Sequence, residues 1–336
     1  LLYIEDKKER QTLQSRSCWL STKGEFDSME TRHLTYPETP DVYPSIMVLG
    51  FFDGVHKGHQ AVINHAKRVA AEHNLPVTVV TFDPHPKQVL SNKPDAVRYI
   101  TPLSRKLKRI EALGVERCLV LTFTKELANL SPQQFVDDYL IGAGAVHVTA
   151  GFDYSYGKFG EGTMETLPYH ARDQFTTSVV TEQTMDGEKV SSTRIRKLLA
   201  EGQVDAAHEL LGTPYVICGE VIHGDARGRT IGFPTANVLM DASYVMPRLG
   251  VYATRVTLPD GRMFHAMTNV GRRPTFYETG SVSVESHLFD FSEDLYGQVI
   301  EIEWIQYIRN ERAFDGLDAL VAQLKEDEVA ARSILS

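Results

Sequence analysis

Hydrophobic and polar positions divide the chain into two regions with different periodicity. Between residues 46 and 180, short apolar runs alternate with longer stretches whose apolar residues recur every three or four positions. Short runs of this kind are typical of buried parallel strands, and the longer stretches of amphipathic helices. The pattern predicts strands at 46–49, 77–82, 118–123, 146–150 and 177–180, and helices near 59–72, 104–113 and 131–140. We therefore expect a doubly wound, Rossmann-like α/β domain.

The periodicity changes after Gly212-Thr213-Pro214. Short alternating runs then dominate, separated by turn residues such as Pro259-Asp260-Gly261; they lie at 215–221, 251–258, 263–270, 281–290 and 299–307. Alternation with such turns predicts an antiparallel sheet closed into a small barrel. A final amphipathic helix carries Leu317, Leu320, Val321 and Leu324. The expected domains are 29–212 and 213–336.

Residues 1–28 differ from both regions. They are polar and charged, carry no periodic pattern and begin without methionine, whereas Met29 opens the stretch that leads into the first strand. We interpret 1–28 as a non-native or disordered prefix. An ordered N-terminal extension is the alternative.

Composition narrows the class of protein. The formal net charge of −9 and the pI near 5.8 disfavour a nucleic-acid binder, which usually carries a basic patch. No apolar run approaches the length that spans a membrane. Cys18, Cys118 and Cys218 are too few and too far apart for a disulfide framework or a zinc site, which favours the cytoplasm.

The first strand ends in a turn that suits a phosphate. The segment from Gly50 to His59 reads Gly-Phe-Phe-Asp-Gly-Val-His-Lys-Gly-His and leads directly into the first helix. Amide donors and the positive end of the helix dipole favour an anion there. Because His56 and His59 are three residues apart, both imidazoles share one face and could hydrogen-bond a phosphate that gains charge. Two surface histidines on an amphipathic helix are the alternative.

Three further motifs follow other predicted strands, at the sheet edge where such folds bind ligands. Prolines on both sides of His85 predict a turn. Glycines and aromatic residues around Asp153 suit a loop that approaches a flat ligand. Hydroxyl and guanidinium groups at a helix start could clamp a polyphosphate, although hydroxyls alone are ordinary caps; they are Ser191, Ser192, Thr193, Arg194 and Arg196.

The barrel region has one dense motif, from His223 to Asn237. Its glycines and arginine could surround phosphates, and the residues concerned are Gly224, Arg229, Gly232, Phe233 and Pro234. Thr235 and Asn237 share one face of an extended segment and offer hard oxygens to a Mg²⁺ that is shared with ATP. Glu285 lies in an alternating strand, where a carboxylate is commonly exposed to solvent.

Together these motifs resemble a known family. The first turn resembles the HxGH signature of nucleotidyltransferases, and 191–196 their Ser-Ser-Thr-x-Ile-Arg element. With the Gly-Phe-Pro-Thr-Ala-Asn core at 232–237, the chain is similar to the bacterial bifunctional riboflavin kinase/FMN adenylyltransferases, or FAD synthetases. The resemblance implies an α/β nucleotidyltransferase domain and a riboflavin kinase barrel with a C-terminal helix.

The resemblance also implies two reactions. The barrel would phosphorylate riboflavin to FMN, and the first domain would transfer an adenylyl group from ATP to FMN, giving FAD and pyrophosphate. The resemblance implies catalytic roles for His56, His59, Arg194 and Glu285, with Glu285 as the base. It also implies that Thr235 and Asn237 hold Mg²⁺. The residues that the resemblance implies in nucleotide and substrate binding are Gly50, Phe51, Phe52, Asp53, Gly54, Asp153, Ser191, Ser192, Thr193, Arg196, Gly224, Arg229, Gly232, Phe233 and Pro234.

Three other functions are alternatives to this bifunctional enzyme. An enzyme that retains one activity would have lost one signature set, and both sets are intact here. A non-catalytic flavin or nucleotide-binding regulator would not need His56, His59 and Glu285 together. A relative of the aminoacyl-tRNA synthetases shares the HxGH element, but the acidic charge and the small β-rich second domain disfavour it.

Overall fold

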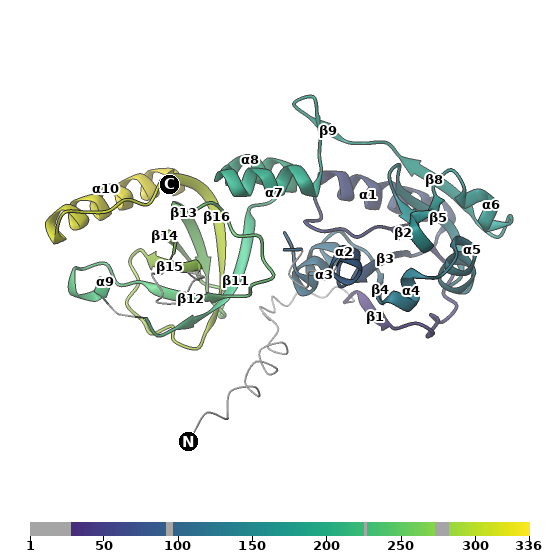
Figure 1. Cartoon of the computed structure of the whole chain (residues 1–336), viewed down its shortest axis with the longest axis horizontal. Helices are drawn as coiled ribbons and strands as arrows, with labels where there is room; N and C mark the ends of the chain where they lie inside the picture. Colours follow the sequence, from purple (N-terminus) through teal and green to yellow (C-terminus); the bar gives the residue numbers. More distant parts are fainter. Residues whose placement is uncertain (1–27, 92–96, 225–226, 273–281) are drawn as a thin grey trace, which may run out of the picture.

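The structure is a computed structural model that describes residues 28–91, 97–224, 227–272 and 282–336. The predicted prefix 1–28 therefore lies outside the described residues except for Ser28. Two units follow each other along the chain, a parallel α/β unit and a β-barrel (Figure 1). This is the fold class that the hydrophobic pattern predicts.

The first unit is built on a six-stranded sheet with the order β1-β4-β3-β2-β5-β8, in which all neighbouring strands are parallel. Its strands are β1 (Glu30–Leu34), β2 (Ser45–Leu49), β3 (Val77–Asp83), β4 (Arg117–Thr122), β5 (Ala145–Gly151) and β8 (Thr176–Val180). Five of these correspond to the predicted runs. The edge strand β1 was not predicted because its Glu-Thr-Arg-His-Leu sequence contains no apolar run.

Helices cover the sheet and connect its strands. The helices that the pattern predicts are α1 (Lys57–His73), α3 (Leu103–Glu111) and α5 (Pro132–Val136). The Ser-Pro-Gln-Gln sequence at 131–134 is typical of a capping box, and Ser131 and Gln134 form one at the start of α5. The helix predicted over 131–140 is not uniform, because from Asp137 to Ile141 it continues as a π-helical turn, η3.

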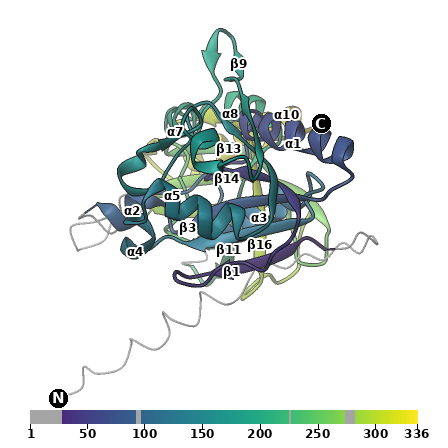
Figure 2. The same cartoon turned by 90° about the vertical axis from the view of Figure 1, so that its right-hand side faces the viewer.

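Short elements fill the connections. They are α2 (Pro86–Leu90), α4 (Lys125–Ala128), α6 (Leu167–Ala171), η4 (Lys158–Gly160) and the paired strands β6 (Ser155–Tyr156) and β7 (Gly162–Thr163). A second hairpin, β9 (Thr184–Met185) with β10 (Glu188–Lys189), projects from the body of the molecule (Figure 2).

The second unit is a closed six-stranded antiparallel barrel with the order β11-β12-β15-β14-β13-β16. Its elements are β11 (Tyr215–Ile222), α9 (Arg227–Thr230), β12 (Ala236–Met240), β13 (Gly250–Thr257), β14 (Met263–Arg272), β15 (Val282–Leu288) and β16 (Val299–Arg309). The pattern predicted five of the strands. It missed β12, which begins inside the glycine-rich motif.

The C-terminal helix α10 (Leu317–Leu335) packs on the outside of the barrel. Of its predicted apolar residues, Val321 and Leu324 pack against the cluster that contains Phe233, Ala331 and Leu335, whereas Leu317 is 60% exposed. Arg309 on β16 forms two hydrogen bonds to the buried carboxylate of Asp327, which anchors the middle of the helix.

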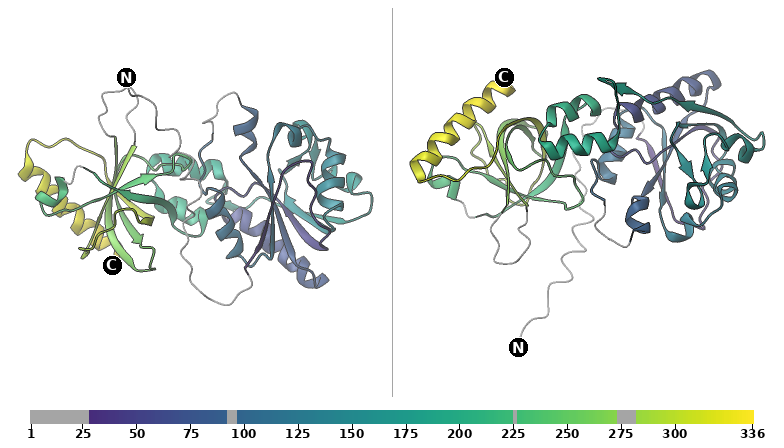
Figure 3. Two further views of the ribbon diagram at one scale, coloured as in Figure 1. Left: turned by 90° about the horizontal axis from the view of Figure 1, so that it is seen from below. Right: turned by 45° about the horizontal axis from the view of Figure 1, so that its top comes forward.

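Two helices, α7 (Ser192–Glu201) and α8 (Val204–Leu211), lie between the sheet and the barrel (Figure 3). Their buried side chains, such as Leu199 and Leu210, belong to one hydrophobic cluster with Tyr215 and Trp304 of the barrel. Ile100 of the first unit belongs to the same cluster. The cores of the two units are therefore continuous across residue 212.

Candidate active sites

The first site is the turn between β2 and α1. Phe52, Gly54 and Val55 have φ angles of 59°, 85° and 38°. A positive φ is costly for a β-branched residue such as Val55, so the surrounding structure must hold it in place. A Cβ atom at Gly50 would lie 2.7 Å from the Phe52 ring, which leaves room only for glycine. The turn is thus fixed in one shape.

The two histidines of this turn form a stacked pair. Their ring centroids are 3.6 Å apart, and Nδ1 of His56 accepts a hydrogen bond from the backbone N–H of His59, which caps α1. Burial lowers the pKa of His56 to about 4 and the pKa of His59 well below its ordinary value. Nδ1 of His59 is buried without a hydrogen-bond partner among the described residues. Both rings are therefore neutral near pH 7.

This burial predicts a pH-dependent stability. The unfolded chain binds protons on these histidines below pH 6.5, whereas folded His56 stays neutral down to about pH 4. Stability should therefore fall as the pH drops from 6.5 towards 4. We expect a lower Tm at pH 5 than at pH 7, and a smaller difference in His56→Asn, which keeps a capping side chain. An unchanged difference would show that His56 titrates normally in the folded protein.

Asp53 connects this turn to the second motif. Its carboxylate, 2% exposed, accepts hydrogen bonds from the backbone N–H groups of Ile100 and Thr101 and pairs with Arg196 of α7. The Ser192 hydroxyl donates to the Asp53 carbonyl at 2.8 Å. Burial raises the pKa of Asp53, and the Arg196 charge opposes that rise. The two predicted signature motifs are therefore in direct contact.

The other residues of the second motif have different surroundings. Ser191 caps α7 by accepting from the backbone N–H of Arg194, and Thr193 is exposed. The guanidinium of Arg194 donates to the carbonyls of Met185 and Glu188 in the β9–β10 hairpin, at 2.8 and 3.2 Å. Of the two arginines proposed for the clamp, only Arg196 hydrogen-bonds to the turn.

The loops after β3 and β5 complete the rim of this site. His85 was expected in a turn, but it caps the short helix α2, and its ring lies 4.3 Å from that of Phe51. Asp153 forms an ion pair with Lys189 of the hairpin at 2.5 Å. The glycine-aromatic loop is thereby tied to the hairpin that holds Arg194.

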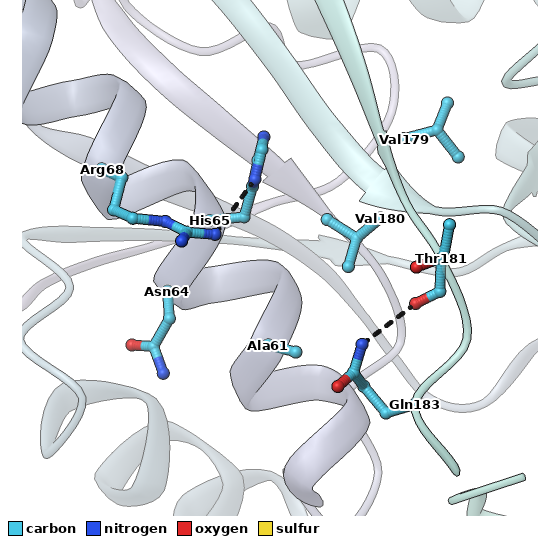
Figure 4. Close-up of a pocket in the computed structure, with 8 residues that line it drawn as sticks. All are labelled: Ala61, Asn64, His65, Arg68, Val179, Val180, Thr181 and Gln183. Carbon is cyan, nitrogen blue, oxygen red and sulfur yellow. Dashed lines mark hydrogen bonds between the residues drawn. The ribbon is translucent and has the colours of Figure 1, made fainter.

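A groove that sequence reasoning missed lies between α1 and the sheet edge (Figure 4). It has a volume of about 630 Å³ and combines polar and apolar side chains with the edge of β8; the lining residues are Ala61, Asn64, His65, Arg68, Val179, Val180, Thr181 and Gln183. Along the chain it begins at Ala61, five residues after His56, and ends at Gln183, next to the β9–β10 hairpin. Only the folded chain brings these separate segments together.

The second site lies on the barrel, around β12 and β15. Asn237 is directly opposite Glu285 in the antiparallel register, and Glu285 is also opposite Asn269 of β14. Thr235 precedes Asn237 by two residues, so its side chain is expected on the same face. A Cβ atom at Gly224 would lie 2.2 Å from the Asn237 amide, so only glycine allows this approach. The fold thus places the predicted amide directly opposite the predicted carboxylate.

A cavity of about 540 Å³ opens next to β12 and β15, lined by Thr235 and by Ala236 and Ser286, the strand neighbours of Asn237 and Glu285. Arg229, Pro234, Thr235, Ser286 and Tyr296 are among its lining residues. The Tyr296 ring stacks on His223 at 3.8 Å and lies near the Arg229 guanidinium. The cavity is therefore lined by both an aromatic ring, Tyr296, and a cationic group, Arg229.

The remaining predicted residues shape the loop before β12. Phe233 is buried and packs on the outer face of the barrel, next to Met267 and Phe289. The Pro234 carbonyl is hydrogen-bonded to the His287 ring at 2.7 Å. Gly232 has a φ of 84° at an exposed turn. These contacts fix the segment that leads into Thr235.

Comparisons with known proteins agree with this arrangement. A family model described as FAD synthetase matches residues 39–194, and one described as riboflavin kinase matches residues 211–335. A protein of Listeria monocytogenes named bifunctional riboflavin kinase/FMN adenylyltransferase is 46% identical over 92% of this chain and 99% of its own length. The chain belongs to this bifunctional family. It carries the FAD synthetase and riboflavin kinase domains in the expected order.

A second relative of the same name and one solved structure are also similar to this chain. The Bacillus subtilis protein of the same name is 46% identical and covers 90% of this chain and 97% of its own. A crystal structure of a protein named macrolide-efflux protein, from Streptococcus pneumoniae, superimposes with a TM-score of 0.85 at 36% identity. It covers 90% of this chain and 99% of that chain. Within the described residues, no helix is both long and apolar enough to cross a membrane.

Proposed function

We propose that the turn after β2 transfers the adenylyl group from ATP to FMN and that the β12–β15 face phosphorylates riboflavin. The observation that carries the first assignment is the contact of Asp53 with Ser192 and Arg196, which joins both nucleotidyltransferase signatures into one site. The second assignment rests on Asn237 lying opposite Glu285 and on Thr235, two residues before Asn237, lining a cavity together with Arg229.

In adenylyl transfer, an FMN phosphate oxygen attacks the α-phosphorus of ATP, and the bond to pyrophosphate breaks. No protein nucleophile is needed. His56 and His59 are neutral and preorganised by their stacking, so their N–H groups can stabilise the charge that develops on the α-phosphate. The start of α7, with Ser191 and Ser192, would receive the leaving pyrophosphate. The groove beside α1 has the size and mixed polarity to seat the adenosine part of ATP.

In riboflavin phosphorylation, Glu285 would accept the proton of the 5′-hydroxyl as that oxygen attacks the γ-phosphorus of ATP. ADP leaves, so the reaction depends mainly on positioning and charge stabilisation. The cavity beside Thr235 would hold ATP, with Arg229 near its phosphates and the Tyr296 ring as an apolar wall.

The donor groups at this site suit Mg²⁺. The described residues contain no cluster of three His, Cys, Asp or Glu side chains that could cage a metal. Hydroxyl and amide oxygens are weak, hard ligands, which fits a Mg²⁺ that keeps waters and shares ATP phosphates. Thr235 and Asn237 would hold it, and when bound it supplies charge neutralisation for the phosphoryl group.

Thr235→Ala should therefore lower the affinity of the kinase site for Mg²⁺. We expect a several-fold higher Mg²⁺ concentration for half-maximal riboflavin phosphorylation, because one of two weak protein ligands is lost. The measurement is the initial rate of FMN formation over a magnesium titration at fixed ATP. FAD formation from FMN should keep its magnesium dependence. An unchanged midpoint for the kinase reaction would remove Thr235 from the metal site.

One assay tests the whole assignment. The purified protein is incubated with riboflavin, ATP and Mg²⁺, and FMN and FAD are separated by chromatography. Appearance of FMN followed by FAD supports two active sites. FMN alone would indicate that only the kinase is retained, and flavin binding without either product would favour a regulator. We place both reactions in the cytoplasm, where ATP is available and the thiols of Cys118 and Cys218 would stay reduced.

A further inference from the structure

Lys106 is a buried cation that none of the sequence motifs includes. It lies in α3, is 2% exposed, and reaches beneath the turn that carries His56 and His59. A buried lysine without partners would be strongly destabilising. The contacts of the Lys106 ammonium group therefore indicate the role of this buried charge.

The ammonium group of Lys106 satisfies all three of its donors inside the protein. It donates to the Phe51 carbonyl, the Thr81 hydroxyl and the Phe82 carbonyl, each at 3.1 Å. The Phe51 ring lies 4.3 Å from the same nitrogen, at a distance typical of a cation–π contact. Thr81 itself donates to the Phe51 carbonyl at 3.0 Å. One side chain thus ties together the carboxyl ends of β2 and β3.

The Phe51 carbonyl lies directly before the strained part of the turn. Phe52, Gly54 and Val55 all have positive φ angles, and His56 follows immediately. Asp53 is held separately by the backbone N–H groups of Ile100 and Thr101, so the hydrogen bonds to Phe51 and those to Asp53 together set the path of the chain that leads to the histidine pair. Because misplacement by about 1 Å can cost a hundredfold in rate, the hydrogen bonds to this carbonyl affect the chemistry.

We propose that Lys106 is a positioning residue for adenylyl transfer, holding the Phe51 carbonyl so that the turn presents His56 and His59 to the phosphate. The inference rests on the proposed function of this turn. Lys106 does not touch the reacting atoms. It acts through Phe51, from outside both signature motifs.

A pH dependence accompanies this geometry. Burial lowers the pKa of Lys106 to about 8, although the nearby Asp83, Asp53 and Cys118 oppose the shift. Among the other groups facing it, burial raises the pKa of Cys118 to about 12, lowers the pKa of His85 to about 4 and of His59 well below its ordinary value, and raises the pKa of Asp83 and Asp53. Above pH 8 the neutral amine keeps two donors for three acceptors. FAD synthesis should then decline while riboflavin phosphorylation in the same chain does not.

The test compares Lys106→Met with Lys108→Met, which removes a charge from the same helix. For Lys106→Met we expect the kcat of FAD formation from FMN to fall about ten- to a hundredfold, with smaller changes in KM. The alkaline decline near pH 8 should also disappear. Riboflavin phosphorylation reports that the chain is folded and should equal that of the parent.

Thr81→Val is the second variant, because it keeps side-chain volume and removes one acceptor of Lys106 together with one donor to Phe51. It should lower the same kcat several-fold. A parent-like kcat in Lys106→Met, or a parent profile without an alkaline decline, would overturn the inference. If Lys106→Met fails to fold, a parent-like kcat in Thr81→Val would overturn it. A parent that makes no FAD from FMN would instead refute the proposed function.

Discussion

Replacing Glu285 with glutamine is expected to lower riboflavin phosphorylation by about 10² to 10⁴, the usual contribution of a positioned general base. Glutamine keeps the shape and hydrogen-bonding capacity of the side chain but cannot accept the proton of the 5′-hydroxyl. Glu285 lies directly opposite Asn237 and two residues from buried His287, so the substitution leaves the strand pairing intact. The measurement is the initial rate of FMN formation at saturating riboflavin and ATP.

Two comparisons make this result specific. Glu303→Gln changes another barrel glutamate, which lies on β16 near Arg255, and should leave the rate unaltered. FAD synthesis from supplied FMN should be the same in Glu285→Gln and the parent, since that reaction belongs to the other site. A parent-like kinase rate in Glu285→Gln would make Glu285 an ordinary strand residue.

The histidine pair should give the second large effect. His56→Ala or His59→Ala is expected to slow FAD formation from FMN about a hundredfold, the usual loss for one donor to a developing oxyanion. His56→Ala also removes the cap of α1, worth about 1 kcal/mol of stability. His56→Asn retains a capping group, and it separates the two contributions. FAD formation is measured with supplied FMN, so that the kinase reaction does not enter the rate.

His73→Ala is the matched control, because His73 is exposed at the far end of the same helix. It should retain the parent rate of FAD formation. All three alanine variants should phosphorylate riboflavin normally. Undiminished FAD synthesis in both His56→Ala and His59→Ala would remove the imidazoles from the mechanism.

The sequence predicted those elements that depend on residues close to one another along the chain. Ile46–Leu49 and the other apolar runs become strands because burial on both faces requires continuous apolar side chains. The capping box at Ser131 and the glycine turn after β2 depend on a few neighbouring residues, and both were recognisable. The alternation after Pro214 was enough to predict a barrel.

Long-range features could not be predicted from such patterns. β1 is a polar edge strand held by pairing with β4, and β12 begins in a motif that resembles a loop. Arg194 and Arg196 look equivalent in the sequence, yet one bonds to the hairpin and the other to Asp53. Lys106 gave no motif signal, because its acceptors come from 25 and 55 residues away along the chain.

The continuous core has a consequence for how the two activities can be separated. Leu210 and Leu211 on one side of residue 212 share a cluster with Tyr215 and Trp304 on the other. If the chain were cut at that point, the barrel half would expose an apolar surface that the other half normally covers, and this surface would promote aggregation. Arg105 of α3 and Glu301 of β16 add an ion pair at 2.7 Å between the units. The two enzymes encoded in this chain are therefore expected to lose their structure in a single cooperative transition on heating.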